Sequence, residues 1–162
     1  MSAEPTYVPG DVFHSRIRKV YAGELDWAVN KQAGQMARVL YSAPHENREE
    51  QGDRRGHGKD FATWIFSEEP GLEEHLFSVP LELAIDARLE PGAAIGLHFH
   101  DRTEEFYYLL EGDLRMTTVE RDGRERTVTL SPGDAHAVKL GQGHTGVAGA
   151  KGARFIAVAV RR

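Results

Sequence analysis

The sequence contains no cysteine among its 162 residues. This absence excludes a disulfide framework, a thiolate nucleophile, an iron–sulfur cluster and a zinc site with cysteine ligands. Any metal ion bound by this chain must therefore take its ligands from histidine, aspartate or glutamate. Eight histidines are present, so their positions along the chain become important.

An excess of positive charge and a long apolar run are also missing. The chain has 20 Lys and Arg residues against 25 Asp and Glu residues, a net charge of −5. We expect no nucleic-acid partner, because such proteins usually present a basic surface. We expect no membrane partner either, because no apolar run approaches the roughly 20 residues of a spanning helix. Residues 1–10 lack the basic and apolar stretches of a signal peptide, which predicts a cytoplasmic protein.

Short stretches with strand-like patterns dominate the second half of the chain. Apolar side chains occupy every second position over residues 81–89, a period that is typical of a half-buried strand. Further candidate strands follow, separated by turn signals such as Asp122-Gly123: 97–100, 105–111, 113–120, 125–130, 135–138, 144–148 and 153–160. Many short strands with few helical stretches predict an all-β fold, such as a small jelly roll.

Residues 1–80 carry weaker patterns. The ranges 14–21, 35–41 and 61–66 have strand-like composition, and residues 23–27 could form one helical turn. Residues 44–60 contain no Val, Ile, Leu, Met or aromatic residue, which predicts a long, flexible solvated loop that could serve as a lid over a pocket mouth. We therefore expect an N-terminal extension of short strands and loop at 1–80, packed on a β-barrel at 81–162 or on a partner subunit.

Histidines gather where the strand pattern is clearest. His98 and His100 are separated by one residue, and on a strand residues i and i+2 point to the same face. Glu105 follows after a short polar turn, so its carboxylate could lie beside both imidazoles. Such a set suits a divalent first-row metal ion. The histidine pair alone is a weak signal, because surface strands carry such pairs by chance.

The spacing around these residues resembles the first motif of the cupin family, G-x5-H-x-H-x(3,4)-E-x6-G. Every defined position of that motif is filled, by Gly92, His98, His100, Glu105 and Gly112. The motif places two of the family's metal-ligand histidines and its ligand carboxylate on neighbouring strands. The resemblance thus concerns the fold and the metal ligands, and it says little about the reaction.

A second stretch resembles the other cupin motif, G-x5-P-x-G-x2-H-x3-N. Gly133, Gly141 and His144 match in spacing, whereas Lys139 and Ala148 stand where the motif has proline and asparagine. Neither departure removes a ligand position. The resemblance covers about residues 81–160, roughly half of the chain.

The resemblance implies a cupin jelly-roll β-barrel with one divalent transition metal bound by His98, His100, Glu105 and His144. A degenerate, metal-free cupin is the alternative, and it is disfavoured because all four ligand positions are filled. Fe is the first expectation for the metal, and Mn, Ni, Zn, Co and Cu are alternatives. Many cupins dimerise, so we expect a homodimer.

Two further side chains are candidates for catalysis. Tyr107 shares the strand face of Glu105, and the spacing HxHxxxxExY resembles the cupin lyases that cleave dimethylsulfoniopropionate, where the tyrosine is the base. In other cupins a tyrosine here often only packs. His136 could be an acid or base in the pocket, or could lie on the outer face or in a dimer contact. The remaining histidines are predicted to be exposed and incidental: His14, His45, His57 and His75.

We predict an enzyme acting on a small polar organic molecule. An Fe(II) dioxygenase is the first hypothesis, because a three-histidine, one-glutamate site leaves positions for substrate and O₂. A non-redox isomerase, lyase or decarboxylase is the alternative, with Tyr107 or His136 as the base. A cupin that only binds a small ligand is a third hypothesis, weakened because residues 1–80 show no convincing helix-turn-helix. The substrate is left open.

Overall fold

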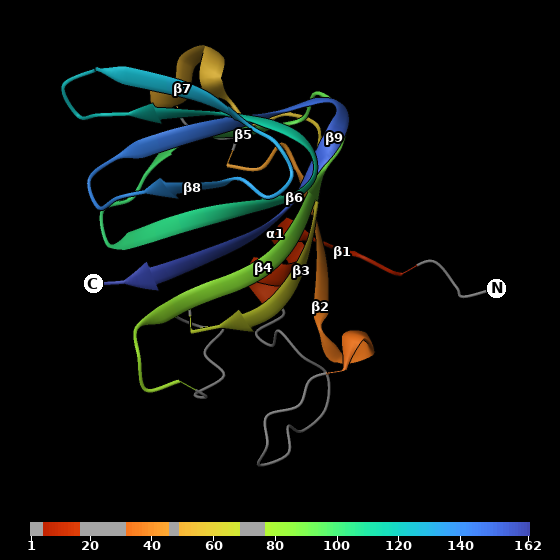
Figure 1. Cartoon of the computed structure of the whole chain (residues 1–162). Helices are drawn as coiled ribbons and strands as arrows, with labels where there is room; N and C mark the ends of the chain where they lie inside the picture. The colour runs from red at the N-terminus through yellow and green to blue at the C-terminus, as the bar shows by residue number, and fades with distance from the viewer. Residues whose placement is uncertain (1–4, 17–31, 46–48, 69–76) are drawn as a thin grey trace.

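A computed structural model of the chain describes residues 5–16, 32–45, 49–68 and 77–162. In these residues nine strands form a single sheet that curls into a barrel (Figure 1). The strands are β1 (Val8–Pro9), β2 (Ala37–Ser42), β3 (Lys59–Ser67), β4 (Leu81–Leu89), β5 (Ala94–Phe99), β6 (Thr103–Val119), β7 (Glu125–Leu130), β8 (Ala135–Val138) and β9 (Gly143–Arg161). The helical elements are α1 (Gly10–Arg16), η1 (Ala33–Gln35) and η2 (Glu49–Arg54). The predicted all-β fold is confirmed.

Two long antiparallel strands, β6 and β9, form the frame of the barrel. They pair along their length, from Thr103 opposite Arg161 to Val119 opposite Gly143. The first half of β6 also pairs with β8 and its second half with β7. In the same way β9 pairs with β4 at its C-terminal end and with β5 at its N-terminal end. The two halves of each long strand therefore pair with different neighbouring strands, which brings distant parts of the sequence together.

Glycines let these strands bend where the sequence pattern predicted turns. Gly112 and Gly152 both have a φ of 77°, in the left-handed region that favours glycine. A Cβ on Gly112 would lie 2.0 Å from the backbone oxygen of Gly152, so a larger residue does not fit. The expected separate strands at 105–111 and 113–120, and at 144–148 and 153–160, are thus the halves of the continuous strands β6 and β9.

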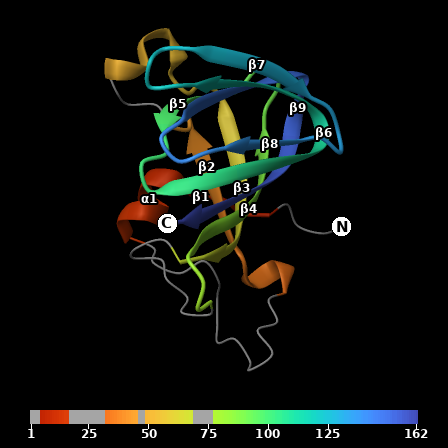
Figure 2. The same ribbon diagram turned by 60° about the vertical axis from the view of Figure 1, so that its left-hand side comes forward.

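The interior holds two apolar clusters. The larger fills the barrel with side chains of β4, β5, β6 and β9, including Leu89, Leu109, Leu114 and Phe155. The smaller joins α1 to β2 and β3, through Phe13, Val39, Ala62 and Trp64. Strands β2 and β3 extend the sheet beyond β4, and the three run side by side in Figure 2. The N-terminal elements therefore pack onto the barrel through their own apolar core.

Two predictions for the N-terminal part are wrong. Residues 14–16, expected to begin a strand, lie in α1, while 17–21 and the turn expected at 23–27 fall outside the described residues. The segment 44–60 contains η2 rather than only solvated loop, and Gln51 within it is buried. The Gln51 side-chain amide donates hydrogen bonds to the backbone oxygens of His45 and, over 2.9 Å, Leu97. A polar segment can be buried when its groups find such partners.

No helix in the described part of the chain is both long enough and apolar enough to cross a membrane.

Candidate metal centre

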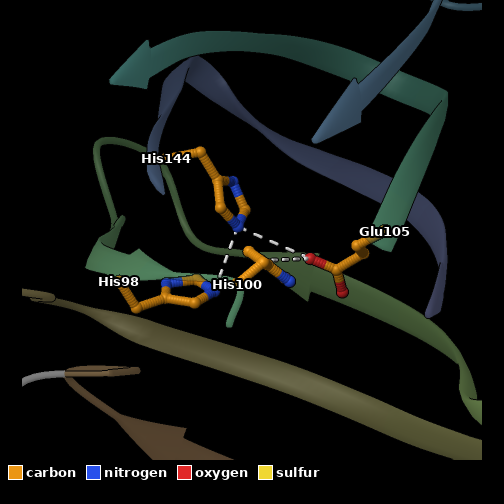
Figure 3. A group of neighbouring side chains, drawn as sticks. All are labelled: His98, His100, Glu105 and His144. Atoms are coloured by element: carbon orange, nitrogen blue, oxygen red, sulfur yellow. Dashed lines mark hydrogen bonds and ion pairs between the residues drawn. The ribbon is translucent and has the colours of Figure 1, made fainter. Parts of the chain in front are cut away.

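The four residues of the predicted ligand set come together inside the barrel (Figure 3). His98 lies on β5, His100 directly follows that strand, Glu105 lies on β6 and His144 on β9. One ligand atom from each residue falls within a group whose members all lie within 4.8 Å of one another. The pairing of β5 with β9 sets His98 opposite His144. Strand pairing therefore turns a sequence pattern into a compact cluster.

The donor atoms of the cluster face one another. Nε2 of His144 lies 3.0 Å from Nε2 of His98 and 3.5 Å from Oε2 of Glu105. Nε2 of His100 lies 3.6 Å from the same Glu105 oxygen. Both Nε2 of His100 and Oε2 of Glu105 are buried and have no hydrogen-bond partner in the protein. Buried polar atoms almost always have a partner. The donor set therefore fits a single divalent metal ion, with His98, His100, Glu105 and His144 as its ligands.

Hydrogen bonds on the far side of two rings hold them in this orientation. Nδ1 of His98 lies 3.0 Å from the backbone oxygen of Gly96, and Nδ1 of His100 lies 2.9 Å from the hydroxyl of Thr103. The Gly96 oxygen can only accept, so Nδ1 of His98 carries the proton and Nε2 keeps its lone pair. Partners of this kind orient metal-binding imidazoles and fix their tautomer.

Burial shifts the pKa values of three of the four ligands. It lowers the pKa of His144 well below the ordinary value, with His100 and His136 adding to the effect, and it lowers the pKa of His100 against the pull of Glu105. Burial raises the pKa of Glu105, while His100 and His98 oppose the shift. Neutral imidazoles are the form that binds metals, and a bound cation would favour ionised Glu105.

The ligands line a cavity of about 420 Å³, within the range of small-molecule sites. The barrel contributes Glu82, Ile95, Tyr107 and Phe155 to the rest of its wall. Elements before the barrel supply the other part: His14, Tyr41, Pro44, His45, Asp60 and Trp64. Sequence analysis singled out none of these six as site residues, although it predicted that the segment 44–60, which contains Pro44, His45 and Asp60, lies over a pocket mouth.

Comparison with known proteins identifies a domain within this chain. A model of the cupin domain matches residues 86–159, the stretch that contains all four ligands. Residues 86–159 form a cupin domain. Over 56 residues the chain is 41% identical to oxalate decarboxylase OxdC of Bacillus subtilis (strain 168). This match covers 35% of this chain and 14% of that protein. The chain thus spans only a small part of the length of this curated relative.

Solved structures give the same likeness. A structure of Bacillus subtilis oxalate decarboxylase at pH 4.6 superposes with a TM-score of 0.54 and 28% identity, over 63% of this chain and 25% of that chain. Another, with the same scores and coverage, concerns the Mn(II) centres of the same enzyme. A predicted oxalate decarboxylase from Thermotoga maritima superposes with a TM-score of 0.53 and 25% identity, over 66% of this chain and 84% of that chain.

Tyr107 lies beside the ligands of the cupin domain. Its side chain is buried, and its hydroxyl donates a hydrogen bond to Glu105. Burial, together with the carboxylates of Glu105 and Asp60, raises the pKa of Tyr107 well above its ordinary value. The phenol therefore keeps its proton at neutral pH, which favours holding Glu105 in place. A role for Tyr107 as a base stays a prediction.

His136 is not brought to the metal centre. It lies on β8, its Nε2 is 3.0 Å from the hydroxyl of Thr118, and it lines a different cavity of the cupin domain, between β7 and β8. Burial and the nearby Arg126 lower its pKa. The cavity that contains the ligands does not include His136 in its wall. Its position gives no support to the predicted role as an acid or base.

Two of the histidines expected to be incidental contact the site. The exposed ring of His45 stacks on His98, with ring centres 4.0 Å apart and an angle of 17°. Nε2 of the exposed His14 lies 2.8 Å from the hydroxyl of Tyr41, which accepts a hydrogen bond from Nε1 of Trp64 over 3.1 Å. His57 is exposed as expected, and His75 lies outside the described residues.

Asp60 is the residue that sequence analysis missed most completely. Its side chain is 7% exposed, and its Oδ1 is buried without a hydrogen-bond partner. Burial raises the pKa of Asp60 to about 7, although a hydrogen bond from the backbone of Arg88 lowers it. The only clue in the sequence is position, since Asp60 directly precedes the apolar run 61–66.

Proposed function

We propose that this chain is a metal-dependent decarboxylase of a small carboxylic acid. The observation that carries this proposal is the buried cluster of three imidazoles and one carboxylate in the wall of a cavity of the cupin domain. The relatives described as oxalate decarboxylases support it. They favour the decarboxylase alternative over the Fe(II) dioxygenase that the sequence suggested first.

His98, His100, Glu105 and His144 would hold one divalent ion. Mn(II) is our first candidate, because the carboxylate ligand suits harder ions and a similar structure concerns Mn(II) centres. Fe, Ni, Zn, Co and Cu are the alternatives. When bound, the ion supplies positive charge that stabilises the negative charge developing on the substrate as CO₂ leaves.

The chain's own residues shape the rest of the site. Thr103 and Tyr107 hold two of the ligands in place through hydrogen bonds. Trp64 and Phe155 add apolar wall, which keeps water from the reacting groups. The hydroxyl of Tyr41, fixed by His14 and Trp64, offers a polar contact to the part of the substrate away from the ligands.

The charge of the wall narrows the class of substrate. Among the described residues, the carboxyl side chains that line the cavity are those of Asp60, Glu82 and Glu105, and no Lys or Arg lines it. A dianion such as oxalate would therefore find no cationic side chain there for its second carboxylate. A volume of about 420 Å³ also leaves room for a larger molecule. We propose a monocarboxylic acid whose remainder is neutral or cationic.

The test is release of ¹³CO₂ from carboxyl-labelled acids by the protein loaded with Mn(II) or Fe(II). The panel contains oxalate and monocarboxylic acids with neutral or cationic substituents, and O₂ is monitored throughout. We expect CO₂ and a decarboxylated product in equal amounts, with a monocarboxylic acid preferred. Consumption of one O₂ per substrate would restore the dioxygenase hypothesis. Tight binding without turnover would favour the binding protein.

A further inference from the structure

Asp60 stands apart from the metal ligands but shares their cavity. It lies near the start of β3, with Tyr41 opposite on β2 and Leu89 opposite on β4. The cavity wall contains Asp60 together with Tyr107 and the four ligands. Its Oδ1 is one of only four buried side-chain polar atoms without a hydrogen-bond partner in the described residues, and the other three belong to ligands.

In the part of the chain that the structure describes, no Lys or Arg side chain lies in the cavity to neutralise Asp60. The exposed Lys59, next to it, extends to Glu90, whose carboxylate lies 3.6 Å away, and the Arg88 side chain is exposed. From the other elements the titratable groups are Tyr41 on β2 and Tyr107 on β6. A carboxyl group buried without a cation prefers its neutral form. Burial indeed raises the pKa of Asp60 to about 7.

We propose that Asp60 is the proton donor of the cavity, with its carboxyl group supplying the proton that replaces the departing carboxylate. This role rests on the proposed decarboxylase function. The bond between the substrate carbon and its carboxyl carbon breaks, and the electron pair stays on the substrate carbon as CO₂ leaves. The O–H bond of Asp60 then breaks and a C–H bond forms. Asp60 regains a proton from water, so no oxidant or reductant is consumed.

The alternative is that Asp60 only maintains the fold. Its carboxylate accepts a hydrogen bond from the backbone of Arg88, so a structural contribution is present in any case. A donor differs from a structural group in its dependence on pH. A donor must be protonated for turnover, and general acid catalysis contributes about 10²–10⁴-fold to a rate. The pH profile therefore separates the two roles.

The experiment compares Asp60→Asn, Asp60→Glu and the control Asp86→Asn in the metal-loaded protein. Asp86 lies on the neighbouring strand β4, bound to Arg154 and outside the cavity wall. We expect Asp60→Asn to lower the rate of CO₂ release by about 10²–10⁴-fold while its metal content stays unchanged. Asp60→Glu should restore part of the rate, and the control should behave as the wild type. The wild-type rate should fall above pH 7, and Asp60→Asn should lack that decline.

A second measurement does not depend on turnover. The infrared band of a protonated carboxyl group should be present in the metal-loaded wild type at pH 6, disappear with a midpoint near 7, and be missing from Asp60→Asn. If Asp60→Asn does not fold, the wild-type pH profile, this titration and the rate of Asp60→Glu still distinguish a proton donor from a purely structural group.

The possible failures are distinguishable. A folded Asp60→Asn that keeps the wild-type rate, or a carboxyl group already ionised at pH 6, overturns the donor role and leaves decarboxylation standing. A wild type that releases no CO₂ from any acid overturns the proposed function and the donor role together.

Discussion

The cavity has two kinds of wall, and they are built on different physical principles. The wall that contains His98, His100, Glu105 and His144 comes from β5, β6 and β9 and brings together four donor groups, of which Nε2 of His100 and Oε2 of Glu105 have no hydrogen-bond partner in the protein. The wall from α1, β2 and β3 rests on an apolar cluster and presents polar tips such as Tyr41 and Asp60. The first is arranged for a cation, and the second for an organic molecule. We infer that changes in the two walls separate metal binding from substrate handling.

The sharpest test of this separation is the removal of a ligand. In His100→Ala the cluster loses one donor, and we expect metal affinity to fall by more than about 100-fold, because loss of a mere supporting partner already costs 10–100-fold. Metal analysis after dialysis against a weak chelator measures it. His136→Ala is the matched control and should keep its metal, since His136 lines the other cavity. Stoichiometric metal in His100→Ala would disprove the ligand assignment.

Asp60 should dominate the pH dependence of stability in the second wall. Its pKa is about 7 when folded and near 3.9 when unfolded, so between these values the folded protein binds the extra proton. Its contribution to the free energy of unfolding therefore declines as pH rises, by about 3 kcal/mol from pH 5 to pH 8. Urea unfolding of the metal-free protein at both pH values measures the decline, and Asp60→Asn should lack it. If the free energy of unfolding changed equally with pH in both proteins, Asp60 would not be buried as described.

The two walls also differ in how far the sequence predicts them. The ligands were predictable because a metal needs donors at fixed spacing on paired strands, which leaves a pattern around Gly92 and Gly133. Asp60 was not, because its burial depends on the pairing of β3 with β2 and β4, a long-range contact without a local signature. Its segment lacks large apolar residues, so composition alone predicted exposure.

The continuity of the long strands was hidden for another reason. Gly112 and Gly152 resemble turn residues in the sequence, and in the structure they adopt the same left-handed conformation that a turn would need. Here that conformation bends the strand around the barrel instead of ending it. Local conformation is therefore predicted correctly, while its consequence depends on which strand runs alongside.

A smaller effect should come from the support of a ligand. Thr103→Val keeps the shape of the buried side chain but removes the hydroxyl that lies 2.9 Å from Nδ1 of His100. We expect metal affinity to fall by about 10–100-fold with the fold intact. Competition with a chelating dye measures the affinity. Thr127→Val, an exposed change at a hydroxyl pair with Thr117, should leave it unaltered. Equal affinities of both variants would mean that His100 is held by packing alone.

The smallest expected effect belongs to the wall made by the N-terminal elements. Tyr41→Phe removes the hydroxyl that bonds to His14 and accepts a hydrogen bond from Nε1 of Trp64. The loss of one hydrogen bond of this hydroxyl corresponds to about 1 kcal/mol of free energy. If this hydroxyl contacts only the remote part of the substrate, KM should rise about fivefold while kcat and metal content stay the same. Tyr108→Phe, an exposed change outside the cavity wall, is the control in steady-state kinetics. A fall in kcat at constant KM would instead place Tyr41 among the groups that act on the reacting atoms, and the division between a wall for the metal and a wall for the substrate would no longer hold.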